Sequence, residues 1–139
     1  MFAVSKSWAL AAPAPAILLV DDDPFLAHAR TAALELRHER VVRAAGAAEA
    51  FILVDQPAFA RDLTLVVVAL HMPGLSGPAF VAELNSRAPG VPVLVLCRPG
   101  ECTEEYGTEN AHLLPHSSPL NEMLRVTEKI LKPTVVRIS

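Results

Sequence analysis

Short apolar runs alternate with helical patterns about five times along this chain, and the alternation limits the folds it can adopt. The runs at residues 16–20 and 63–70 are apolar on both faces, which is typical of strands buried inside a parallel sheet. Apolar residues at helical spacing follow the runs. Crossovers of this length between buried strands predict a parallel sheet with helices on both faces.

The expected elements can be placed along the chain. Strands are expected over residues 16–20, 41–45, 63–70, 91–97 and 111–114. Helices are expected over residues 24–39, 47–56, 78–87 and 119–131, and the segment 98–110 favours at most a short helix. Asp23 suits the cap of the first helix, and Pro24 suits its first turn.

The length of 139 residues predicts one domain, and 52% hydrophobic residues exclude a disordered chain. We expect an Ala/Pro-rich arm at residues 1–15, a domain at 16–132 and an extended tail at 133–139. The arm resembles a signal peptide only faintly, because prolines interrupt it.

Charge and cysteine usage exclude several classes of protein. A net charge of -3, without a basic surplus, argues against nucleic-acid binding. No apolar run approaches the about 20 residues that span a bilayer, so we expect no membrane partner. The two cysteines form neither a disulfide framework nor a zinc motif, which favours a reduced, cytoplasmic setting.

In a sheet of this kind, ligands bind at the carboxyl ends of the strands. The candidate residues are therefore those at or just after each strand end: Asp21–Asp23, Gly46, Ala69–His71, Cys97–Arg98 and Pro115–Ser117.

Three segments carry a family resemblance. They are LLVDDDP after the first expected strand, VVVALHMPGLSG after the third and LLPHSSPLNEML after the fifth. Together with the alternation, they resemble the receiver domain of bacterial response regulators in two-component signalling, over residues 16–132. The resemblance implies a flavodoxin-like, doubly wound α/β fold with five parallel strands in the order 2-1-3-4-5.

The resemblance also implies where the functional residues would stand. In the family, an acidic pair after the first strand holds Mg²⁺, and an aspartate ending the third strand accepts a phosphoryl group. The pair corresponds to Asp21 and Asp22, and the acceptor position, three residues before Met72, holds Ala69. No aspartate follows Asp62, so no register restores the acceptor. Alanine has no nucleophile, which excludes acyl-phosphate chemistry at that position.

The other family positions differ as well. The Thr or Ser that ends the fourth strand is Cys97, the lysine of the fifth strand corresponds to His116 and Ser117, and the aromatic switch is Leu113. Lysine occurs only at residues 6, 129 and 132. We interpret the chain as a degenerate receiver that is not an enzyme and requires no cofactor. The changes occur together, which favours natural change over a single engineered inactivation.

We expect such a chain to act as a phosphorylation-independent interaction module in phosphorelay signalling, bound to a sensor kinase, a regulator or itself as a homodimer. One alternative is a metal or small-ligand sensor, with weak Mg²⁺ binding at Asp21 and Asp22 or a transition metal held with His71. Another is a fragment of a longer regulator that lacks its output domain.

Two side chains carry more specific expectations. His116 is expected above the acidic pair, where the carboxylates would raise the pKa of its imidazole, so that an ion pair replaces the metal. Cys97 is expected to be buried beside Ala69 as a small hydrophobe. A reactive thiol or a Cys97–Cys102 disulfide is the alternative, because the intervening Pro99 and Gly100 leave that geometry open.

Overall fold

The computed structural model describes residues 14–69, 71, 76–102, 106–108 and 110–132. Its strands are β1 (Ala16–Asp21), β2 (Val41–Ala44), β3 (Leu63–Ala69), β4 (Val93–Cys97) and β5 (Ala111–Pro115). Its helices are α2 (Pro24–Leu34), α3 (Ala47–Val54), α4 (Pro57–Asp62), α5 (Gly77–Arg87) and α6 (Leu120–Leu131). The strands are parallel and lie in the order β2-β1-β3-β4-β5, which confirms the predicted flavodoxin-like fold.

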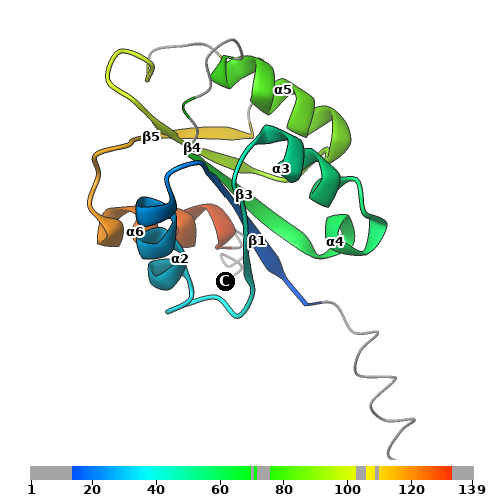
Figure 1. Cartoon of the computed structure of the whole chain (residues 1–139), viewed down its shortest axis with the longest axis horizontal. Coiled ribbons are helices and arrows are strands. Elements are labelled where there is room, and N and C mark those ends of the chain that lie inside the picture. Colours follow the sequence, from blue (N-terminus) through cyan, green and yellow to red (C-terminus); the bar gives the residue numbers. More distant parts are fainter. Residues whose placement is uncertain (1–13, 70, 72–75, 103–105, 109, 133–139) are drawn as a thin grey trace, which may run out of the picture.

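The sheet lies between two layers of helices (Figure 1). Helices α2 and α6 lie side by side on one face, and α3, α4 and α5 cover the other. No helix within the described ranges is long and apolar enough to cross a membrane.

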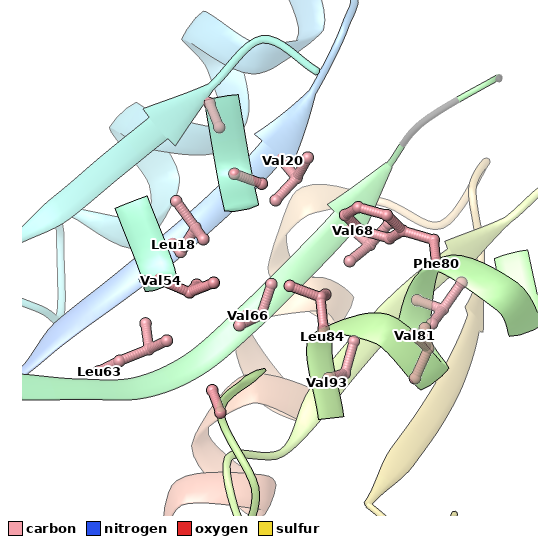
Figure 2. Packing of buried hydrophobic residues seen from close by; sticks show 14 of the residues in the cluster. Leu18, Val20, Val54, Leu63, Val66, Val68, Phe80, Val81, Leu84 and Val93 are labelled. Atoms are coloured by element: carbon pink, nitrogen blue, oxygen red, sulfur yellow. The ribbon is translucent and has the colours of Figure 1, made fainter. Parts of the chain in front are cut away.

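Successive side chains of a strand point to opposite faces of the sheet, and helices cover both faces. Both sets of side chains on the central strands are therefore buried. Leu18 and Val66 pack toward α3 and α5, among the residues shown in Figure 2. Their neighbours Leu19 and Val67 pack toward α2 and α6. Burial on both sides explains why these strands are near-continuous apolar runs in the sequence.

The largest differences from the expected helices are the early end of α2 and the presence of α4. Helix α2 ends at Leu34, five residues before the predicted end, and residues 35–37 form a turn toward β2. Leu36 is 76% exposed there, so a longer helix would have had no apolar surface to cover. Helix α4 was not predicted, although Pro57 in its first turn and the buried Phe59 are ordinary helix signals.

The remaining expectations concern the segment 98–110, the two terminal segments and the turn at 72–75. The described part of 98–110 contains no helix, in line with the prediction. Residues 1–13 of the expected arm, 72–75 of the expected turn and 133–139 of the expected tail lie outside the described residues.

Candidate functional site

The carboxyl ends of β1 and β3 meet at the position that the sequence indicated. Asp21 and Ala69 are partners in the register of the two strands. Both are buried, and both belong to the face of the sheet that α2 and α6 cover. Just beyond this pair, the backbone N–H of His71 donates to Asp22 Oδ2 over 3.4 Å. The residues that the sequence placed at these two strand ends therefore lie together at one edge of the sheet.

Arg30 forms the central contact of the site, a buried ion pair with Asp21. Its Nη1 lies 2.7 Å from Asp21 Oδ2, and the side chains are 6% and 0% exposed. The other carboxylate oxygen, Oδ1, accepts a hydrogen bond from the backbone N–H of Asp23 over 3.0 Å. Both oxygens of Asp21 thus have partners within the chain.

A second arginine holds the backbone of the same residue. Arg43 reaches across from β2, and its Nε and Nη2 donate to the carbonyl oxygen of Asp21 over 3.2 and 2.9 Å. This paired contact fixes the end of β1 from the neighbouring strand. Asp21 is therefore held through its side chain by α2 and through its main chain by β2.

The start of α2 explains how Arg30 reaches this position. Asp23 caps the helix as predicted, its side chain accepting from the backbone N–H groups of Phe25 and Leu26 over 2.9 and 3.1 Å. From that start, the buried side of the helix carries Ala27, Arg30, Ala33 and Leu34. Arg30 thus occupies one place in an apolar stripe that faces the sheet, where its charge needs the carboxylate of Asp21.

These donors do not fit the Mg²⁺ ion that the family resemblance implies. Mg²⁺ prefers near-octahedral oxygen ligands. The carboxylate of Asp21 is fully buried and already neutralised by Arg30, Ala69 supplies no side-chain oxygen, and only Asp22 is exposed. Among the described residues, no three His, Cys, Asp or Glu side chains are grouped to hold a metal.

The expectation for His116 was wrong. Partial burial lowers the pKa of the imidazole, and the nearby charges of Arg30 and Arg98 lower it further, against weaker opposite effects of Asp21 and Asp23. The ordinary pKa is about 6.5, so the neutral form is favoured at neutral pH. Arg30, and not His116, supplies the positive charge that balances Asp21.

For Cys97, the expected burial is confirmed and the disulfide alternative applies in place of the free thiol, but the expected position beside Ala69 was wrong. Cys97 is buried, as predicted, but it forms a disulfide with Cys102, with the Cα atoms 5.4 Å apart. Its side chain belongs to the core beneath α3 and α5, whereas Ala69 belongs to the core beneath α2 and α6. Alternation along the strands separates the two side chains, even though both stand at strand ends.

The turn after β5 lies at the same edge of the sheet as Asp21 and Arg30. The backbone N–H of His116 donates to the carbonyl oxygen of Cys97 over 2.7 Å, which joins this turn to the end of β4. Ser117 is exposed, and Leu113 on β5 is 37% exposed. A groove of about 460 Å³ lies between α2 and this turn, and Arg30, His116 and Ser117 contribute to its wall. The structure therefore brings His116 and Ser117 near Arg30.

Sequence reasoning missed the two arginines that organise the site. Arg30 had a usable signal, because it is a charged residue at a position where the helical spacing calls for an apolar one. Arg43 had none, since an exposed arginine on an edge strand is common and its partner is a main-chain oxygen.

Comparisons with known proteins agree with this architecture. Residues 17–111 match the family described as Response regulator receiver domain. The fold is similar to the receiver domain of the hybrid histidine kinase CckA, with a TM-score of 0.69, 21% identity, and 84% of this chain and 99% of that chain covered.

Two further solved structures are similar. A response regulator receiver protein from Pseudomonas putida has a TM-score of 0.68 and 23% identity, covering 86% of this chain and 99% of its own. A receiver domain protein from Bacillus halodurans has a TM-score of 0.71 and 20% identity, covering 88% of this chain and all of its own. A search of curated protein sequences finds no match. On the family match and the sheet order together, the chain belongs to the response regulator receiver domain family.

Proposed function

We propose that this receiver domain acts in two-component signal transduction as a phosphorylation-independent protein-interaction module. The observation that carries the proposal is the buried ion pair between Asp21 and Arg30. It supplies, from within the chain, the positive charge that a cluster of carboxylates would otherwise take from a metal ion.

The proposal also depends on the residue at the end of β3. An acyl phosphate needs a carboxylate nucleophile, and the methyl group of Ala69 offers none. Ala69 is 3% exposed and is the register partner of Asp21, so it occupies the interior of the site and not its rim. In this proposal the domain is not an enzyme, because the position of the acceptor carboxylate holds Ala69 and the acidic residue beside it, Asp21, is paired with Arg30.

The end of β1 and its surroundings form a fixed surface that a protein partner can bind. Arg30 and Arg43 hold the end of β1 from two sides, which favours a single arrangement of this edge. Around it stand apolar side chains without cover in the described structure: Phe25 at the start of α2 is 81% exposed, and Leu120 at the start of α6 is 40% exposed. Exposed aromatic and aliphatic side chains beside polar groups suit a protein partner.

We propose that the partner is a sensor kinase, another regulator or a second copy of this chain, and that binding takes place in the cytoplasm without nucleic acid, membrane or cofactor. The net charge of -3 supports the exclusion of nucleic acid.

Binding measurements test the proposal directly. The full chain is titrated against sensor kinases and regulators of its own cell, and against itself, before and after incubation with acetyl phosphate and MgCl₂. The same Kd in both states is expected, because no phosphoryl group is taken up. A Kd that changes several-fold only after acetyl phosphate treatment would contradict the proposal, and an authentic receiver that retains its acceptor aspartate serves as the control.

A further inference from the structure

The two cysteines of the chain are joined at the end of β4. Cys97 is the last residue of the strand, is 3% exposed and packs in the core beneath α3 and α5. Cys102 is half-buried against the same core. Their Cα atoms are 5.4 Å apart, inside the usual range of about 4.4–6.8 Å for disulfides.

The turn between the cysteines has a backbone hydrogen bond of its own in addition to the disulfide. The backbone N–H of Glu101 donates to the carbonyl oxygen of Arg98 over 2.9 Å. Gly100 has a φ of +87°, a conformation that glycine adopts without strain. The turn itself therefore returns the chain toward β4, so reduced thiols would stay near each other and could form the bond again.

The bond restrains only a local segment. The cysteines are separated by five positions, and the stabilisation from closing a loop decreases as the loop becomes shorter. The two apolar layers that hold the sheet are extensive without it. Opening a disulfide of this kind therefore leaves the domain folded.

We propose that Cys97 and Cys102 form a reversible redox site whose exchange partner is a low-molecular-weight thiol of the glutathione class. The proposal is independent of the interaction function above. In reduction, a glutathione thiolate attacks Cys102 Sγ, the more exposed sulfur, forming a mixed disulfide while the bond to Cys97 breaks. Cys97 leaves as a thiolate and takes up a proton. A second glutathione thiolate then releases Cys102 as a thiol and forms glutathione disulfide, so that two glutathione molecules are oxidised for each protein disulfide reduced.

The position of the site gives the reaction a structural consequence. Opening the bond removes the covalent restraint on residues 98–102 and leaves the backbone hydrogen bond of the turn to hold them, while Cys97 remains in the ladder between β4 and β5. The carbonyl oxygen of Cys97 accepts from the backbone N–H of His116, so the freed turn lies beside the turn that follows β5. The redox state of the pair would thus set the mobility of one corner of the candidate site.

A redox titration of the full chain tests the proposal. The protein is equilibrated with a series of ratios of reduced to oxidised glutathione, its free thiols are alkylated, and the intact mass is measured. We expect reduced and disulfide forms to interconvert within this series, reaching the same ratio from either starting state. A bond that no glutathione ratio reduces in the folded protein, or one that excess glutathione disulfide does not form, would overturn it.

Hydrogen–deuterium exchange supplies the second readout. Reduction should increase amide exchange at residues 98–102 several-fold and leave β1 and β3 unchanged. Cys102→Ser should show the reduced pattern under all conditions, and Glu101→Gln, in the same turn, should keep the redox response of the natural chain. The same exchange in both redox states would contradict the proposed effect on the turn, and so would a lost response in Glu101→Gln.

Discussion

Arg30 Nη1 lies 2.7 Å from Asp21 Oδ2, and the pair is almost completely removed from solvent. Two opposite charges buried together are stable only while both are present, because each has lost its hydration. The end of β1 is therefore balanced by a helix of the same chain, and not by an ion from solution.

Arg30→Ala should lower the free energy of unfolding by about 3–5 kcal/mol, because it leaves the carboxylate of Asp21 buried without a partner. Urea unfolding measures the change. Arg125→Ala is the matched control: Arg125 also pairs with an acidic residue, Glu122, but on the surface, and its loss should change stability far less. A cost no greater for Arg30→Ala than for Arg125→Ala would show that the buried pair does not form.

Asp21→Asn combined with Arg30→Met should recover much of the stability lost in Arg30→Ala. The double variant removes both charges, so neither is left without a counterion, and Met fills the space with an apolar chain. Equal losses for the single and double variants in urea unfolding would mean that packing, and not charge, determines the effect.

Asp23→Ala should destabilise the chain by about 1 kcal/mol, since Asp23 accepts two backbone N–H groups at the start of α2. Asp22→Ala removes a neighbouring, exposed carboxylate and should cost clearly less. Chemical denaturation of both variants checks the assignment of the cap, and the reverse order of costs would assign it to Asp22.

Stability should fall as the pH decreases below about 6.5, in part because of His116. Its pKa is lowered by burial and by Arg30 and Arg98, so the unfolded chain binds more protons in the range between the folded and unfolded pKa values. The contribution is complete above the unfolded pKa and is lost as the pH falls toward the folded one. His116→Asn should flatten the Tm profile in this range; an unchanged slope would contradict the lowered pKa.

The part of the same Tm profile below pH 3.8 serves as an internal control for the His116→Asn variant. The pKa of Asp62 is lowered chiefly by the hydrogen bond from Arg61, so its contribution is lost only as the pH falls below the ordinary value of 3.8. Loss of stability in that lower range should be the same in the natural chain and in His116→Asn.

Mg²⁺ should not stabilise the protein. A site occupied at ten times its Kd would raise the free energy of unfolding by about 1.4 kcal/mol through linkage. We expect the same Tm in MgCl₂ as in KCl of equal ionic strength, because Arg30 already neutralises Asp21. A Mg²⁺-specific rise that disappears in Asp22→Asn would show that a metal binds at this edge.

The fold could be predicted from sequence because its signals are local and repeated. The run at β3 contains three valines at residues 66–68 and is apolar on both faces, so it indicates a central parallel strand without any knowledge of its neighbours. The placement of Asp21 and Ala69 at one edge followed from the rule that ligands bind at the carboxyl ends of parallel strands, and the structure adds that they are register partners.

The contacts of the site could not be predicted in the same way. The helical spacing places Arg30 on the buried side of α2, but it does not say which charged partner Arg30 meets there, because that partner, Asp21, belongs to β1. Cys97 was expected beside Ala69 because both end strands. In the register of β3 and β4, Val68 pairs with Val95, so Cys97 lies one residue beyond the level of Ala69 and its side chain points to the opposite face.

Phosphoryl transfer to the intact chain tests the central claim most directly. The full protein is incubated with radiolabelled acetyl phosphate and MgCl₂, and the label retained on the folded chain is compared with that on a receiver whose third strand ends in aspartate. We predict no label above that of the heat-denatured chain, because Ala69 offers no nucleophile. A stable label that is released by alkali would contradict the account.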